Sequence, residues 1–293
     1  MIKKVFPLWI FFLFIFFSAA MSGILRAENN SLDAVKNTLA SVEERKAAID
    51  ELKQTGNPEL VASLGEILRT GNEPIILRGY AAEALETMPI ESAGETLRTV
   101  LNSQVSDIES RKLALHSLIA KEPVKMIPEL IQIAQNKNEV PAIRVSAIQY
   151  LAKNPESATG QFYMAIFLNG LNPIPVRIAV LDALDKQDLF QQNPNLLTQT
   201  ILASTEAPEL RKSAVLVASR NLPSSDFSQI LMEVIRRTDN SAEMRYFAIN
   251  HLASQKPNAL LLPQLKQILS KEKDPAISSN LKSLIENWSN PRL

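Results

Sequence analysis

Residues 111–118 read RKLALHSL, and residues 144–151, 33 positions later, read RVSAIQYL. The same pattern recurs along the chain, with an arginine followed by apolar residues three, four and seven positions on. Offsets of three, four and seven lie on one face of an α-helix. The fifth position after each arginine faces away, and it is polar in six of the seven copies, with Leu216 as the exception. This contrast between two faces predicts helices.

The repeat is marked by arginines that follow one another at intervals of 33 or 34 residues. They are Arg45, Arg78, Arg111, Arg144, Arg177, Arg211 and Arg245. A further helical stretch lies between consecutive copies, and prolines such as Pro141 and Pro208 precede the arginine position, where the start of a helix tolerates them. The sequence therefore predicts two helices in each repeat. A period of this length is typical of stacked helical solenoids.

The sequence has two predicted helices per 33 or 34 residues, with proline between them and small residues on the inner face. In this pattern the chain resembles the HEAT repeat family and is close to its short bacterial form. The resemblance covers residues 31–290 and implies an all-α fold, a right-handed α-solenoid of about eight helix pairs. The family often has an acid in the turn before the arginine. Here that acid is clear at Asp107 and Asp274, approximate at Glu139 and Asp239, and absent elsewhere, so no continuous acid–arginine ladder is expected.

Each repeat arginine lies beside the apolar face, so we expect these side chains to be half-buried, and a buried charge needs partners. A guanidinium has five donors in a rigid fork, which suit loop carbonyls and a neighbouring carboxylate. The structural interpretation is a link between repeats, and the functional interpretation is a row that binds anions. Because the arginines follow the period rather than a local cluster, the structural interpretation is favoured.

The first 27 residues differ from the rest of the chain. Lys3 and Lys4 precede an almost wholly apolar run, VFPLWIFFLFIFF over residues 5–17, and small residues follow it. This layout is typical of a secretory signal peptide. Residues 5–25 are also long enough to cross a bilayer as an uncleaved anchor, and only then would a membrane be a partner. Under both alternatives we expect residues 28–293 to be exported, periplasmic or secreted, as a single HEAT-like repeat domain.

The composition argues against several kinds of site. There is no cysteine, which excludes disulfides and thiolate metal sites. His116 and His251 lie about four repeats apart, so they cannot share a metal ion. After residue 27 the chain has 28 basic and 31 acidic side chains, whereas nucleic-acid-binding proteins have a basic surface. No phosphate-binding or hydrolase motif is present. The sequence thus predicts no metal, no cofactor, no nucleic acid and no enzymatic activity.

The predicted binding surface is the concave face that the second helices line. Its open positions include those five and nine residues after the arginines. At offset five they are Asp50, Glu83, His116, Gln149, Asp182 and Asn250, and at offset nine Lys153, Lys186 and Arg220. The N-terminal half of this face is expected to be acidic, and the C-terminal half to have positive charge.

Two further predictions concern packing. Residues 162–168, FYMAIFL, are the most apolar stretch after the leader, and we expect a buried first helix there, with an exposed contact patch as the alternative. Trp288 is expected to close the C-terminal repeat, because no further repeat covers that end.

These observations lead to the hypothesis of an exported, non-enzymatic scaffold that binds a protein or peptide on its concave face. Two alternatives stay open. One is a HEAT-like enzyme or cofactor-handling protein, since HEAT-like families include bilin lyases and base-removing DNA enzymes. The other is a structural subunit of an envelope complex. Fold alone cannot separate these alternatives, because one fold serves many functions.

Overall fold

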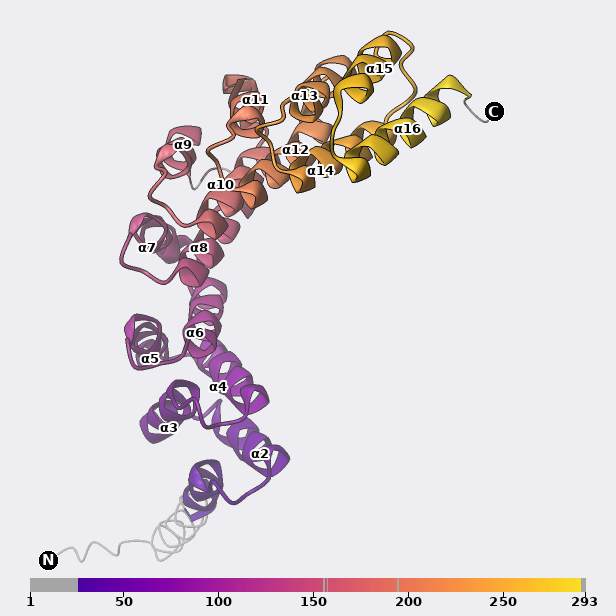
Figure 1. Cartoon of the computed structure of the whole chain (residues 1–293). Coiled ribbons are helices and arrows are strands. Elements are labelled where there is room, and N and C mark those ends of the chain that lie inside the picture. The colour runs from indigo at the N-terminus through magenta and orange to yellow at the C-terminus, as the bar shows by residue number, and fades with distance from the viewer. Residues whose placement is uncertain (1–25, 155, 157, 194, 291–293) are drawn as a thin grey trace, which may run out of the picture. The chain divides into compact units, whose positions relative to one another are not determined.

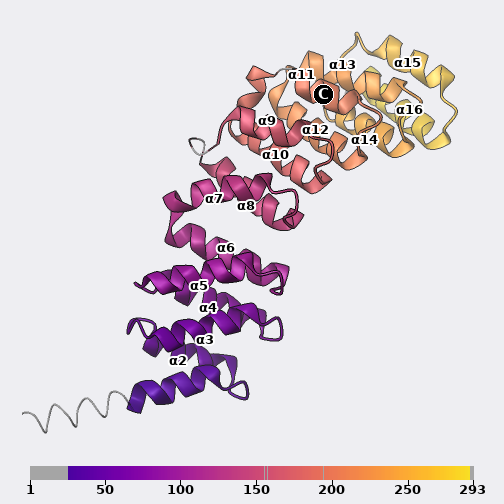
Figure 2. The same ribbon diagram turned by 90° about the vertical axis from the view of Figure 1, so that its left-hand side faces the viewer.

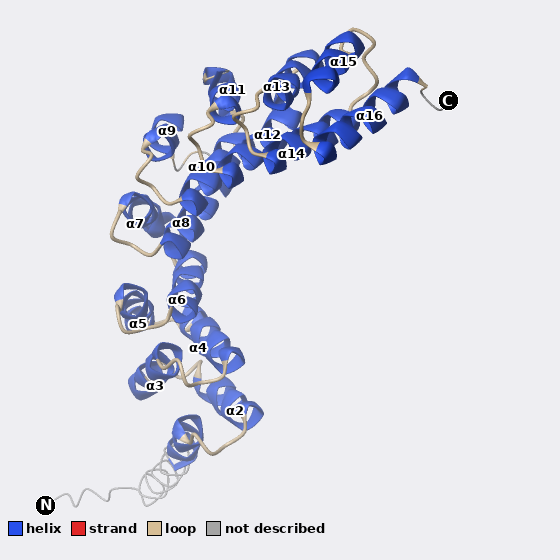
Figure 3. Cartoon of the chain, in the orientation of Figure 1, coloured by secondary structure: helices blue, strands red, loops and turns tan. Residues whose placement is uncertain are grey.

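The computed structural model of the chain describes residues 26–154, 156, 158–193 and 195–290. These residues are helices joined by turns and loops, with no strand among them (Figure 3). The chain forms two compact units, divided between residues 129 and 130. The predicted signal segment lies outside the described residues, apart from residues 26 and 27, and stays a prediction, as does the single domain over 28–293. Among the residues described, no helix combines the length and the apolar character needed to cross a membrane.

Unit 1 is a stack of helix pairs in two layers (Figure 1). Residues 26–36 are helical and supply the first helix of the first pair. The layer of second helices contains α2 (Val42–Leu52), α4 (Ile75–Thr87) and α6 (Ile108–Lys121), and the layer of first helices contains α3 (Pro58–Arg69) and α5 (Glu91–Asn102). Figure 2 shows this unit from the side of the first helices. Neighbouring helices of one layer pack against each other, so the repeats follow one another in chain order.

Unit 2 continues the same alternation, and the boundary between the units falls inside α7 (Pro123–Gln135). Its second helices are α8 (Pro141–Lys153), α10 (Ile174–Lys186), α12 (Pro208–Asn221), α14 (Ala242–Ala253) and α16 (Pro275–Ser289). Its other first helices are α9 (Gly160–Leu168), α11 (Asn195–Leu202), α13 (Ser224–Arg236) and α15 (Leu262–Lys271), and a 3₁₀ helix, η1 (Leu189–Gln192), follows α10. The described residues thus form eight helix pairs, which confirms the predicted all-α repeat fold.

The apolar face of every second helix is buried, as its periodicity predicts. All 21 side chains three, four and seven positions after the arginines are at most 6% exposed. In α9, Tyr163, Ile166 and Phe167 are buried, which confirms the predicted buried helix, while Leu168 at its end is 65% exposed. Trp288 is 5% exposed in α16, in agreement with its predicted role at the C-terminal end.

Gly65 lies in α3 where this helix approaches α5. A Cβ at residue 65 would lie 2.6 Å from Thr96 Cγ2. We therefore expect Gly65→Ala to lower the free energy of unfolding by about 1–3 kcal/mol in urea denaturation, because overpacking outweighs the better helix propensity of alanine.

Two controls separate packing from propensity at Gly65. Thr96→Ser removes the methyl group that the new Cβ would meet, so it should restore most of the loss in the Gly65→Ala chain. At Gly79, in α4, nothing lies within 4 Å of an added Cβ. Gly79→Ala should therefore stabilise the protein by about 0.5–1 kcal/mol. A stabilising Gly65→Ala would show that α3 and α5 are not held this close.

Candidate functional site

The seven repeat arginines occupy the fourth position of their second helices, and between 1% and 8% of each residue is exposed. They are buried more deeply than the sequence suggested. In six of them, Nε donates to the carbonyl oxygen of the residue ten positions earlier, as in Arg177 to Phe167 at 2.9 Å. That carbonyl lies at or near the end of the first helix, where carbonyls lack a partner within the helix. The arginine therefore ties the two helices of its own repeat together.

The other guanidinium nitrogens reach the turn of the following repeat. Arg177 donates from Nη1 and Nη2 to the two carboxylate oxygens of Glu206, both at 2.7 Å. In five other repeats the acceptors are the side chains of Glu73, Asp107, Asn172, Asn240 and Glu272. Each of these arginines thus joins its own helix pair to the next, and this geometry favours the structural interpretation over a row that binds anions.

The arginine ladder is more complete than the predicted acids indicated. The partner of Arg245 is Glu272 rather than Asp274, whose side chain instead caps α16 by accepting from Ile277 N at 3.0 Å. The partner of Arg211 is the neutral Asn240 at 2.7 Å. The acidic and amide side chains that accept from the arginines lie 27 to 29 positions after them, and an amide replaces the acid in two repeats. The ladder of acids is therefore interrupted at Asn172 and Asn240, as expected, whereas a search for an acid at one fixed position missed Glu73, Glu206 and Glu272.

Glu206 and Glu272 are expected to make the stability of the protein depend on pH. Hydrogen bonds from their arginines lower the pKa of each carboxyl below its ordinary value of 4.5. A carboxyl whose pKa falls on folding stabilises the fold above its unfolded pKa, and this contribution disappears as pH falls through the folded pKa. The melting temperature should therefore drop as pH falls from about 5 towards about 3. Glu272→Gln should make this drop smaller, and an identical pH profile in both proteins would contradict the assignment.

The predicted surface residues of unit 1 are exposed on consecutive second helices. Asp50, Glu83 and His116 lie on α2, α4 and α6. Lys53 Nζ lies 2.6 Å from Asp50 Oδ1, and the hydrogen bond to Asp50 is the main cause that raises the pKa of Tyr80 to about 12. The acidic character of this face is therefore reduced by Lys53. Sequence reasoning missed Tyr80 because it considered offsets such as five and nine from each arginine, whereas Tyr80 lies two residues after Arg78.

The predicted surface residues of unit 2 are also exposed. They are Gln149 and Lys153 on α8, Asp182 and Lys186 on α10, Arg220 on α12 and Asn250 on α14. Arg220 Nη2 lies 2.5 Å from Oδ2 of Asp185, an acid on the preceding second helix that sequence reasoning missed. Although Asp182 is exposed, partial desolvation by its neighbours, followed by repulsion from Asp185, raises its pKa. The positive charge predicted here is thus partly balanced, and both signs lie close together.

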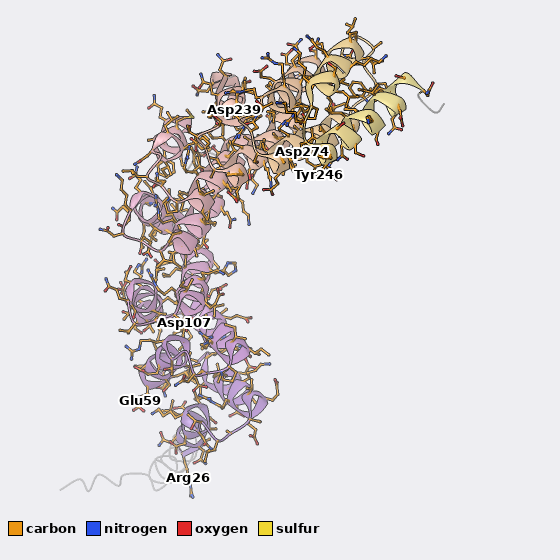
Figure 4. The ribbon with its side chains drawn as sticks, viewed as in Figure 1. Arg26, Glu59, Asp107, Asp239, Tyr246 and Asp274 are labelled. Carbon is orange, nitrogen blue, oxygen red and sulfur yellow. The ribbon has the colours of Figure 1, made fainter. Side chains whose placement is uncertain are left out.

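Two large apolar side chains interrupt the polar surface of unit 2. Leu216 on α12 and Tyr246 on α14 are 44% and 45% exposed, and their helices pack against each other. Tyr246 lies on the side of α14 that faces away from α13 (Figure 4). The sequence contained a signal for Leu216, the single apolar residue at an otherwise polar offset. For Tyr246 the signal was weaker, namely an aromatic ring in a chain with 6% aromatic residues.

The described surface has hollows that lie away from the predicted binding residues. One of about 420 Å³ in unit 1 is lined by Lys36, Glu59 and Ile67, with the paired Arg45 and Glu73 on its wall. Another, of about 370 Å³, lies between α13 and α15. Within the described ranges, no three His, Asp or Glu side chains are grouped so that they could hold a metal ion.

No model of a known protein family matches this sequence, and no curated protein does either. Among solved structures, that of human deoxyhypusine hydroxylase in complex with glycerol is similar. The identity is 15%, the TM-score is 0.36, and the match covers 91% of this chain and 98% of that chain. The described residues form an all-helical repeat of stacked helix pairs.

The prediction of a non-enzymatic scaffold is contradicted by this comparison, because the protein found is an enzyme. The prediction failed because it relied on the absence of local catalytic motifs. Catalytic side chains can come together from distant repeats, and the same fold can support binding or catalysis. At this level the likeness concerns the fold and transfers neither an active site nor a substrate to the present chain.

Proposed function

We propose that the chain is a structural subunit of a protein assembly outside the cytoplasm, and that a partner protein contacts the second-helix surface of unit 2. Its supporting observation is the exposure of Leu216 and Tyr246 among the polar side chains of α10, α12 and α14. Apolar and aromatic side chains within a polar rim are typical of protein interfaces. The location outside the cytoplasm follows from the pattern of residues 1–27.

The surroundings of Leu216 and Tyr246 suit a protein rather than a nucleic acid. Arg220 is held by Asp185, with Nε at 3.1 Å and Nη2 at 2.5 Å from the same carboxylate oxygen. Lys186 lies on the same helix as Asp185, so anions and cations alternate over this part of the surface. Nucleic acid binding depends on a surface of one positive sign, whereas protein interfaces accept paired charges at their rim.

The proposal is tested by the mass of the protein isolated from its own cells under mild conditions. We expect a complex larger than the 32.5 kDa of the chain, with one partner protein at a constant ratio. Leu216→Glu combined with Tyr246→Ala should release the chain from this complex without lowering its melting temperature. Both side chains are half-exposed, so the fold does not depend on them.

A matched control changes an exposed leucine elsewhere in unit 2. Leu260 is 81% exposed in the turn before α15, and Gln264 is exposed on α15. Leu260→Glu combined with Gln264→Ala makes the same chemical change on another surface and should leave the complex intact. A wild-type protein that migrates alone, or a partner that both double variants retain, would refute the proposed contact surface.

A further inference from the structure

A row of exposed aliphatic side chains follows one edge of unit 1, where the turn of each helix pair enters the second helix. Ile75 and Ile108 are the first residues of α4 and α6 and are 50% and 42% exposed. Ile76 is 66% exposed, and Leu39 and Val105, each in a turn, are 95% and 86% exposed. These five residues are called the turn edge. Because α4 packs against both α2 and α6, equivalent residues lie one repeat apart along it.

The start of a helix does not require these isoleucines. In unit 2 the first residue of α8, α12 and α16 is a proline, whose fixed backbone angle suits that position. In unit 1, α2 and α6 are instead capped by Ser41 and Asp107, whose side chains accept from backbone N–H groups. Aliphatic side chains at the turn edge contribute nothing to these caps, and they are too exposed to belong to the core.

The same pair of charged side chains lies beside the turn edge in the first and the third repeat. Glu43 and Lys46 flank it in the first repeat, and Glu109 and Lys112 flank it at the same positions of the third. Each glutamate pairs with its lysine at 3.2 Å, so neither end of the row has a net charge from these residues. Ile76 lies midway between Glu43 and Glu109 in the sequence. Each end of the turn edge therefore has one Glu–Lys pair and one highly exposed aliphatic turn residue, Leu39 or Val105.

We propose that two copies of the chain associate through their turn edges, antiparallel about a two-fold axis near Ile76. Two-fold interfaces use the same patch on both subunits, which requires a self-complementary surface. In this arrangement Ile76 meets its counterpart, and Leu39 lies opposite Val105 of the partner subunit. The aliphatic row is buried between the copies, as is typical of homodimers, whose interfaces are more apolar than other contacts.

The charges beside the row favour a protein surface over a lipid surface. The side chains of Glu43 and Glu109 are 78% and 59% exposed and each is paired with a lysine, so the row has no net positive charge from these residues to attract anionic headgroups. In the antiparallel pair, each Glu–Lys pair meets another Glu–Lys pair, and the lysines can bridge to glutamates of the other copy. This association goes beyond the proposed function, because it uses residues of unit 1 and neither Leu216 nor Tyr246 of unit 2.

Single introduced cysteines test the arrangement, because the sequence contains no cysteine of its own. Ile76→Cys should form a disulfide-linked dimer rapidly under mild oxidation. Leu39→Cys and Val105→Cys should each stay unlinked alone, yet link when the two proteins are mixed. Leu171→Cys is the control, because Leu171 is 88% exposed at the equivalent turn position of unit 2 and should stay unlinked.

The mass of the full chain, processed as in its own cells and purified free of other proteins, gives an independent result. We expect light scattering to show twice the mass of one chain at high concentration, and Ile76→Glu to return it to one chain with an unchanged melting temperature. If Ile76→Glu impairs folding, the cysteine pattern decides. One chain's mass at every concentration would overturn the proposal. Linking of Leu171→Cys as fast as of Ile76→Cys would also overturn it.

Discussion

Arg245→Met is expected to lower the free energy of unfolding by about 3–5 kcal/mol, as measured by equilibrium denaturation. Arg245 and Glu272 form the most deeply buried ion pair described, with 6% and 5% of their side chains exposed. Removal of the guanidinium leaves the Glu272 carboxylate buried without its cation. It also takes the donor from the carbonyl of Ile235, which now accepts from Arg245 Nε at 2.9 Å. A buried charge that loses its partner destabilises far more than an exposed one.

Two matched variants identify the source of the Arg245 effect. Arg220→Met removes an arginine from an ion pair in the same unit, but the Arg220 side chain is 55% exposed, so a loss below about 1 kcal/mol is expected. Arg245→Met combined with Glu272→Gln should recover part of the loss, because no buried carboxylate is then left unpaired. Equal losses for Arg220→Met and Arg245→Met would contradict the role assigned to the ladder.

Phe227→Ala is expected to destabilise the protein by about 3–5 kcal/mol in the same measurement. Phe227 is a first-helix residue in α13, 1% exposed, and among the largest fully buried side chains. Truncation removes apolar contacts and leaves a cavity that the surrounding helices cannot fill completely. In a repeat stack each helix pair depends on its neighbours, so the lost packing weakens the adjoining pairs as well.

Tyr246→Ala is the control for Phe227→Ala, because it removes an aromatic ring of similar size from the neighbouring helix. Since Tyr246 is 45% exposed, we expect a change in the free energy of unfolding of no more than about 0.5 kcal/mol. The same variant should weaken the proposed partner contact. A large loss of stability from Tyr246→Ala would show that this ring is part of the core and not of a binding surface.

The fold could be predicted because the sequence repeats, so that the same position can be compared between copies. The offsets three, four and seven after each arginine are apolar in all copies, whereas offset five is polar in all but one. Burial of one face and exposure of the other follow from helix geometry. The partners of the arginines could not be predicted in the same way. Glu272 and Asn240 lie in turns, where the distance from the arginine varies by one or two residues and an amide can replace an acid.

The exposed surface was predicted position by position, but its chemistry depends on contacts between repeats. Asp185 and Arg220 are 35 residues apart and meet because α10 and α12 are neighbours. No pattern within one repeat indicates that contact. The functional hypothesis failed for a related reason. The absence of a motif in a sequence is weak support for the absence of an activity, since sites are built from residues that only the fold brings together.

Site-specific photo-cross-linking in the source cell tests the proposed assembly most directly. The photoreactive side chain replaces Tyr246 on α14 in one protein and Gln264 on α15 in the other. We predict a single protein adduct from position 246, of the same partner that co-purifies with the chain, and none from position 264. Adducts of equal yield from both positions, or none from position 246, would contradict the claim that this surface of unit 2 holds a partner protein.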